Sequence, residues 1–246
     1  MLMIEHGSLG AVPNEQGHCG RDELEELGSS VTIQRGEALY GAGDAADRCW
    51  RVVAGCVRKV ELLDDGRRHV SAFLLPGDFF GFDDPDISSL GAEAVTTTTL
   101  RCYPRSAVEA LAESNPAISR QLSALTIANL HTAYQRMVLL SRKTSAERLA
   151  SFMLEMARRL GSAGGSIFSL PMGREDIADY LGLTKETISR VLSEMSRSNV
   201  VRLTRTNVEI LDHPELVSRN GTGIEKAKQI GSQVWHPCQT GSAIAA

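Results

Sequence analysis

Long apolar runs are missing from this sequence. The longest, such as residues 72–75 and 137–140, are far shorter than the ~20 residues that a helix needs to cross a bilayer. A secretory signal has a basic cluster followed by an apolar stretch. The first 20 residues contain no such pattern. We therefore expect no transmembrane helix, no membrane partner and a cytoplasmic location.

Cysteine is scarce and scattered along the chain. The five cysteines are Cys19, Cys49, Cys56, Cys102 and Cys238. They include no C-x-x-C pair, which argues against both a disulfide framework and a zinc cage. We expect free thiols, no metal site and no other cofactor.

Two common enzyme signatures are also absent. No GxxxxGK phosphate loop occurs. The six histidines, spread from His6 to His236, include no His-x-His pair of the kind that cupin enzymes use for metal binding. We therefore expect that the protein is not an enzyme.

The composition is that of an ordinary globular protein, with 246 residues, 42% of them hydrophobic and 23% charged. This length accommodates two domains. Residues 1–141 hold 12 Lys and Arg against 19 Asp and Glu, residues 142–212 hold 11 against 9, and residues 213–246 hold 3 against 2, so −7, +2 and +1 sum to −4. An acidic first part and a basic later part indicate a regulatory module followed by one that binds nucleic acid.

Short β-rich runs broken by glycine fill residues 31–103. The runs cover residues 31–33, 38–40, 50–63, 69–75 and 92–103. Asp64-Asp65-Gly66, between two of them, is a strong hairpin signal. We expect these runs to form a β-roll.

The periodicity changes at Ser114-Asn115-Pro116, where a polar cap precedes a proline in a first helical turn. Residues 117–141 contain no glycine or proline, so we expect a long helix. Its apolar residues fall on two stripes: one can pack on the roll while the other meets a second subunit, or both can lie inside one chain. The candidate dimer contacts are Ile118, Leu122, Leu125, Leu130, Ala133, Met137 and Leu140.

A helix-turn-helix is predicted over residues 172–195. Residues 174–181 have the spacing of one helix, Gly182 supplies a left-handed residue at its end, and Thr184 caps a second helix that begins at Lys185. Residues 199–203 and 208–210 are typical of the two strands of a wing. An ordinary helical hairpin with a solvated face is the alternative.

The outer face of the second helix carries groups that suit base edges. Arg190 can donate two parallel hydrogen bonds to guanine, Glu186 can accept from the amino group of cytosine or adenine, and Ser189 can donate or accept. The further candidate DNA contacts are Lys185, Thr184, Thr187 and Arg174.

Three motifs are distinctive. They are Leu-Gly-Leu-Thr-x-Glu-Thr-Ile-Ser-Arg at 181–190, Gly-Asp-Phe-Phe-Gly-Phe-Asp at 77–83, and Leu-Ser-Arg-Lys-Thr-Ser-Ala-Glu-Arg-Leu at 140–149. With them the sequence resembles the CRP/FNR superfamily of transcription regulators, in its FNR/FixK branch, over about residues 22–212. The resemblance implies an α+β fold: an N-terminal cyclic-nucleotide-binding-like β-roll, a long dimerisation helix and a C-terminal winged helix-turn-helix.

The resemblance also implies how the chain divides. We expect a flexible N-terminus at residues 1–21, a sensor domain at 22–113, the dimerisation helix at 114–141 and the DNA-binding domain at 142–212. Residues 213–246 form a C-terminal extension for which disorder is the default.

The function implied is that of a homodimer that binds palindromic DNA, recruits RNA polymerase and acts as an activator. In this branch the Glu-x-x-Ser-Arg positions recognise half-sites of TTGAT type, which carries over to Glu186, Ser189 and Arg190. Lys185 departs from the branch, where an apolar residue is usual, so it either alters the outer-base preference or contacts a phosphate. FixK-like members commonly control microaerobic, anaerobic or nitrogen-related genes.

The roll lacks the residues of two sensor sites found in this superfamily. A cyclic-nucleotide pocket needs an arginine after the glycine corner, yet residues 69–100 contain no Lys or Arg and five acidic residues. We therefore expect no binding of cAMP. The iron–sulfur cluster of FNR needs four thiolates, three of them near the N-terminus, where only Cys19 is present. A FixK-like protein without the cluster is the expectation.

Two alternatives stay open. Cys19 and Cys102 are candidate redox thiols, and a regulator gated by a thiol or a small ligand would belong to the same superfamily. A ligand-sensing scaffold that does not bind DNA is the second alternative. It would leave Glu186 and Arg190 together on one exposed face without an explanation.

Overall fold

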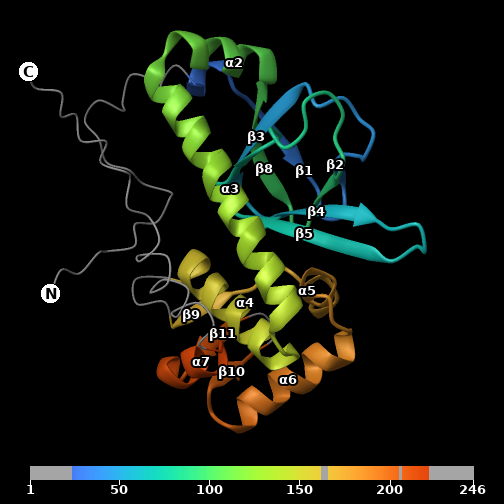
Figure 1. The fold of residues 1–246 in the computed structure, drawn as a ribbon, viewed down its shortest axis with the longest axis vertical. Coiled ribbons are helices and arrows are strands. Elements are labelled where there is room, and N and C mark those ends of the chain that lie inside the picture. Colours follow the sequence, from blue (N-terminus) through green and yellow to red (C-terminus); the bar gives the residue numbers. More distant parts are fainter. Residues whose placement is uncertain (1–23, 162–165, 205–206, 222–246) are drawn as a thin grey trace, which may run out of the picture.

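The computed structural model describes residues 24–161, 166–204 and 207–221. A β-roll comes first, a long helix runs along it, and a helical domain with a small sheet follows (Figure 1). The expected fold class is confirmed. Residues 1–21, Cys19 and most of the 213–246 extension lie outside the described residues.

The roll consists of two four-stranded antiparallel sheets. One has the order β1 (Ser29–Ile33), β8 (Thr98–Pro104), β3 (Arg48–Ala54) and β6 (Phe79–Phe80). The other has the order β2 (Ala38–Tyr40), β7 (Gly91–Ala94), β4 (Val57–Leu62) and β5 (Arg68–Leu74). Side chains from the two sheets share a core that includes Trp50, Val57 and Phe80.

Two predicted features of the roll can be compared with the strands. The hairpin at residues 64–66 is confirmed, because Leu62 pairs with Arg68 across it. The predicted run 50–63 is two strands, since Gly55 turns the chain between β3 and β4 with φ +93°. A Cβ atom at Gly55 would lie 2.6 Å from the carbonyl oxygen of Thr97, so a side chain has no room there.

Three helices connect the roll to the second domain. They are α2 (Arg105–Ser114), which the sequence did not reveal, α3 (Pro116–Arg142) and α4 (Ser145–Leu160). The cap predicted for α3 is confirmed: the Asn115 side chain accepts from the amide of Ala117 at 3.0 Å. In the described ranges, no helix has the length and apolarity needed to span a membrane.

The two apolar stripes of α3 have different surroundings. Ile118 is 1% exposed inside its own chain, and Leu122 packs beside it on a small cluster of the roll and α2. The assignment of Ile118 to a dimer surface is therefore wrong. The second stripe is open: the exposed apolar residues are Ile127, Leu130, Tyr134, Met137 and Val138, each at least 44% exposed.

The second domain follows α4. It contains β9 (Ile167–Ser169), α5 (Arg174–Leu181), α6 (Lys185–Arg197), β10 (Val201–Leu203), β11 (Asn207–Ile210) and α7 (His213–Arg219). The three strands form one antiparallel sheet in the order β10-β11-β9. The expectation of disorder from residue 213 onward is wrong for α7. Asp212 caps this helix, and Leu216 is completely buried.

One hydrophobic core crosses the boundary between the roll and the second domain. Phe73 of β5 lies 5.1 Å from Tyr180 of α5 and 6.3 Å from Phe152 of α4, measured between ring centroids. Arg136 of α3 donates to the carbonyls of Ser71 and Tyr180 and lies 3.9 Å above the Tyr180 ring. The roll and the helices are therefore packed as one body.

Ion pairs strengthen the same boundary, and we call them the Asp176 cluster. Asp176 on α5 accepts from Arg58 of β4 at 2.7 Å and from Arg68 of β5 at 2.8 Å. Arg58 also binds Glu93, and Arg68 also binds Asp179. The Asp176 side chain is only 12% exposed, so its charge depends on these two partners.

Replacing Asp176 should weaken the contact between the roll and the second domain and so destabilise the protein. We expect Asp176→Ala to lower the free energy of unfolding by about 3 to 5 kcal/mol, because it leaves two partly buried guanidinium groups without their shared partner. Denaturant titration would measure this decrease. Asp179→Ala is the matched control and should cost less, since only Arg68 is deprived of a partner. Equal decreases would contradict the central place of Asp176.

Candidate nucleic-acid interface

The predicted helix-turn-helix is formed by α5 and α6. Gly182 ends α5 with φ 62° and ψ 42°, the left-handed conformation that glycine adopts without strain. The Thr184 hydroxyl then accepts from the amide of Thr187 at 3.2 Å and caps α6. Local sequence therefore fixes the corner.

Arg148 of α4 fixes the same corner from behind. Its guanidinium donates to the carbonyls of Leu181, Leu140 and Lys143, at 2.9, 2.7 and 3.0 Å. The ends of α3 and α5 and the start of α4 are thereby joined by one side chain. Sequence reasoning gave Arg148 no role, although it lies in the 140–149 motif.

The apolar face of α6 sets the direction of its outer face. Ile188, Val191, Leu192 and Met195 are all at most 4% exposed. With these positions in the core, Glu186 and Arg190 are exposed and Ser189 is half-buried between them. The predicted recognition residues therefore occupy one face, one helical turn apart.

The charges on this face are available to a ligand. Within the parts of the chain that the structure describes, neither Glu186 nor Arg190 forms an ion pair or a side-chain hydrogen bond. Glu186 lies in the first turn of α6, where the helix dipole stabilises a carboxylate. Arg174 of α5 donates to the Ser189 hydroxyl at 3.2 Å, so it lies beside the same face.

The other predicted contacts border this face. Lys185 is exposed at the start of α6. The hydroxyls of Thr184 and Thr187 are 3.0 Å apart and hydrogen-bonded to each other. Since Thr184 also caps the helix, its oxygen is less free for DNA than the sequence suggested.

The predicted wing is present. Val201 to Leu203 pairs with Val208 to Ile210 in antiparallel register, and Phe168 of β9 pairs with Val208 on the other side. An ordinary helical hairpin would have no such sheet. The tip at residues 205–206 lies outside the described residues.

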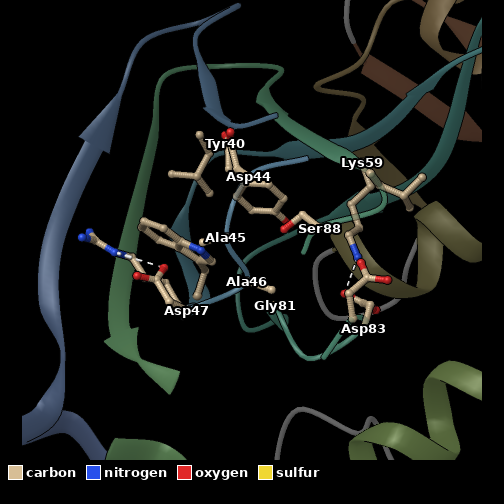
Figure 2. A pocket seen from close by; sticks show the side chains of 14 residues that line it. Tyr40, Asp44, Ala45, Ala46, Asp47, Lys59, Gly81, Asp83 and Ser88 are labelled. Atoms are coloured by element: carbon tan, nitrogen blue, oxygen red, sulfur yellow. Dashed lines mark hydrogen bonds and ion pairs between the residues drawn. The ribbon is translucent and has the colours of Figure 1, made fainter. Parts of the chain in front are cut away.

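The roll has a cavity of about 340 Å³ away from this face (Figure 2). Its acidic lining residues are Asp44, Asp47, Asp83 and Asp84, and its cations are Arg48 and Lys59. Lys59 is 7% exposed and forms an ion pair with Asp83. The lining therefore carries an excess of negative charge, which disfavours an anionic ligand.

The cysteines of the roll are buried. Burial raises the pKa of the Cys49 and Cys56 thiols to about 12 each, so they are protonated at neutral pH. Cys102 is 5% exposed, which contradicts its interpretation as an accessible redox thiol. Among the described residues no group of three or more His, Cys, Asp and Glu is placed to hold a metal.

Comparison with known proteins covers both domains. The cyclic nucleotide-binding domain family matches residues 30–115, and the Crp-like helix-turn-helix domain family matches residues 147–219. Nitrogen fixation regulation protein FixK of Rhizobium meliloti (strain 1021) is 39% identical over 189 residues, which cover 74% of this chain and 85% of that protein.

Two further similarities agree. Transcriptional activatory protein AadR of Rhodopseudomonas palustris is 33% identical over 204 residues, covering 82% of this chain and 85% of that protein. The solved structure of FixK2 from Bradyrhizobium japonicum has a TM-score of 0.76 and 39% identity, covering 79% of this chain and 98% of that one. The chain therefore belongs to the CRP/FNR family of transcription regulators, in its FixK-like branch.

Proposed function

We propose that this regulator is a homodimer that binds a TTGAT-type palindrome through α6 and activates transcription by recruiting RNA polymerase. The observation that carries the proposal is the joint placement of Glu186, Ser189 and Arg190 on one exposed face. An unpaired carboxylate beside DNA phosphates is repelled unless it meets an amino donor on a base. If α6 reads the base sequence in the DNA groove, the amino group of a base provides Glu186 with such a donor.

The contacts would divide into two kinds. Arg190 donates to guanine O6 and N7, and Glu186 and Ser189 contact neighbouring bases. Lys185, Arg174 and Thr187 lie around them and suit phosphate oxygens, which position a protein on DNA without selecting sequence.

The exposed stripe of α3 supports the dimer. Leu130 and Met137 are 58% and 59% exposed in the isolated chain, and α3 contains no acidic residue. Apolar residues three and four positions apart favour a coiled-coil-like contact between two copies. The dimer contacts that we retain are Leu130, Ala133 and Met137, joined by Ile127 and Tyr134. Leu140 is half-buried near the end of this stripe, and the half-buried Leu122 and Leu125 lie on the other stripe with Ile118.

Activation and physiological role are proposed from the relatives. The names of two relatives describe a regulator of nitrogen fixation and an activatory protein. We propose an activator of nitrogen-related or low-oxygen genes that works in the cytoplasm, without catalysis. The acidic loop at residues 83–86 is exposed in part and is the candidate contact for RNA polymerase.

Cyclic AMP is not the proposed effector. The roll cavity holds four aspartates against two cations, and Lys59 is already paired. Calorimetric titration with cAMP should show no saturable binding, because the phosphate meets net negative charge. A micromolar dissociation constant would overturn this part of the proposal.

Arg190→Ala should reduce selectivity. We expect the preference for a TTGAT palindrome over the same site with its guanine replaced to fall by about 1 to 3 kcal/mol, measured by fluorescence anisotropy at fixed salt. Arg197→Ala, at the far end of the same helix, is the control and should leave the preference unchanged. Uniform weakening on all sequences by Arg190→Ala would show that Arg190 contacts phosphate instead.

Met137→Glu should convert the dimer to a monomer. The substitution places two carboxylates against each other in the proposed contact between the α3 helices of the two subunits, which we call the seam. Sedimentation equilibrium should give the 26.6 kDa mass of one chain for the variant and twice that mass for the unchanged protein. Gln135→Glu, exposed on α3 outside the stripe, should remain dimeric. A dimeric Met137→Glu protein would contradict the proposed seam.

A further inference from the structure

The link between α3 and α4 is two residues long. α3 ends at Arg142 and α4 begins at Ser145, so Lys143 and Thr144 connect them. Both residues have an extended backbone, with ψ of 142° and 166°. Domains turn against each other at such element ends, where a few residues absorb the change in φ and ψ. The direction in which the second domain leaves α3 is therefore set at Lys143 and Thr144.

The Lys143 side chain is bound to the end of α7. Its ammonium donates to the Asn220 side-chain oxygen at 2.7 Å and to the Ser151 hydroxyl at 2.8 Å. The Ser151 hydroxyl also lies within hydrogen-bonding distance of the Asn220 oxygen. All three residues are half-buried, and we call them the Lys143 cluster.

The ammonium of this cluster has neutral partners. In the ranges that the structure describes, Lys143 forms no ion pair. Burial lowers the pKa of its ammonium below the usual range, and Glu147 opposes the shift. A partly buried charge is costly to leave without its hydrogen-bond acceptor. The hydrogen bond to Asn220 therefore differs from an exposed ion pair, which contributes little.

The end of α7 is closely seated on α4. Leu216 is completely buried, and α7 packs against α4. Gly221, directly after Asn220, has φ +78°, and a Cβ atom there would lie 2.5 Å from the Glu147 carboxylate. Glycine suits both the left-handed backbone and this close approach. The packing of α7 therefore holds the Asn220 side chain in place.

The backbone of Lys143 is bound as well. Its carbonyl accepts from Arg148 at 3.0 Å, and the same guanidinium donates to the carbonyl of Leu181 at 2.9 Å. Leu181 is the last residue of α5, before the corner at Gly182. A chain of contacts therefore leads from Asn220 through Lys143 and Arg148 to the corner that precedes α6.

Ion pairs attach the second domain to the roll at two other places. The Asp176 cluster joins α5 to the roll, and Arg159 in the last turn of α4 pairs with Asp78. Two such contacts alone allow a rigid body to turn about the line that joins them. The Lys143 cluster lies toward the other end of α4 from Arg159. It provides a third point of attachment, which opposes this rotation.

We propose that Lys143 and Asn220 are positioning residues for DNA binding, whose hydrogen bond fixes the angle of the second domain on α3 and so the separation of the two recognition helices in the dimer. The inference rests on the proposed homodimer and its palindromic site. Each base pair added between half-sites changes their separation by about 3.4 Å and their rotation by about 35°. Lys143 and Asn220 therefore affect the selection of half-site spacing and not the choice of bases.

The experiment compares Asn220→Ala with the unchanged full-length protein on a single half-site and on palindromes that differ by one base pair in the central spacer. The unchanged protein should strongly prefer one spacer. Asn220→Ala should bind that palindrome several-fold more weakly and lose most of its discrimination among spacers. The two proteins should bind the single half-site alike, because α6 is untouched. Fluorescence anisotropy at fixed salt measures these affinities.

Three further variants serve as controls. Asn220→Asp keeps an oxygen for the Lys143 ammonium and should retain the spacer preference. Ser218→Ala, which changes an exposed residue of the same helix, should behave like the unchanged protein. Lys143→Met removes the donor from the other side of the contact and should reproduce the effect of Asn220→Ala. It replaces that variant if Asn220→Ala does not fold.

Equal weakening on the half-site and on every palindrome would show that the Lys143 cluster only stabilises the fold, which would overturn the inference. An intact spacer preference in Lys143→Met and Asn220→Ala would do the same, as would its loss in Asn220→Asp. If the unchanged protein does not prefer the palindrome to random DNA, the proposed function fails instead.

Discussion

The packing of the apolar face of α6 into the second domain is the constraint on which the remaining interpretation depends. Four side chains of this helix lie in the core, so its rotation about its own axis is fixed. A slip of one residue would turn the helix by about 100° and place Ile188 in solvent. Gly182 and the Thr184 cap set where the helix begins, and Arg148 holds the preceding corner. The outward direction of Arg190 follows from these contacts.

The same constraint extends to the roll through α5. Tyr180 packs on Phe73 and under Arg136, and Asp176 binds two arginines of the roll. The orientation of the helix-turn-helix is therefore set by the β-roll as well as by its own core. A change in the roll that disturbed β4 or β5 would move α5 and, with it, the face that carries Arg190.

Local signals predicted a large part of the fold and the candidate site. The cap at Asn115, the hairpin at Gly66 and the corner at Gly182 each depend on a few neighbouring residues, and each is confirmed. Contacts between distant segments could not be predicted. The burial of Ile118, the pairing of Arg58 with Asp176 and the hydrogen bond of Lys143 to Asn220 all depend on tertiary packing. The order of α7 depends likewise on its packing against α4.

Methylation interference at the guanine of the half-site is the most direct test of the central claim, that α6 brings the Arg190 guanidinium to a base edge. Methylation of guanine N7 removes one of the two acceptors in the major groove. It should block binding by the unchanged protein and make little difference to Arg190→Ala, which no longer uses that atom. Equal interference with both proteins, or none with the unchanged protein, would contradict the account.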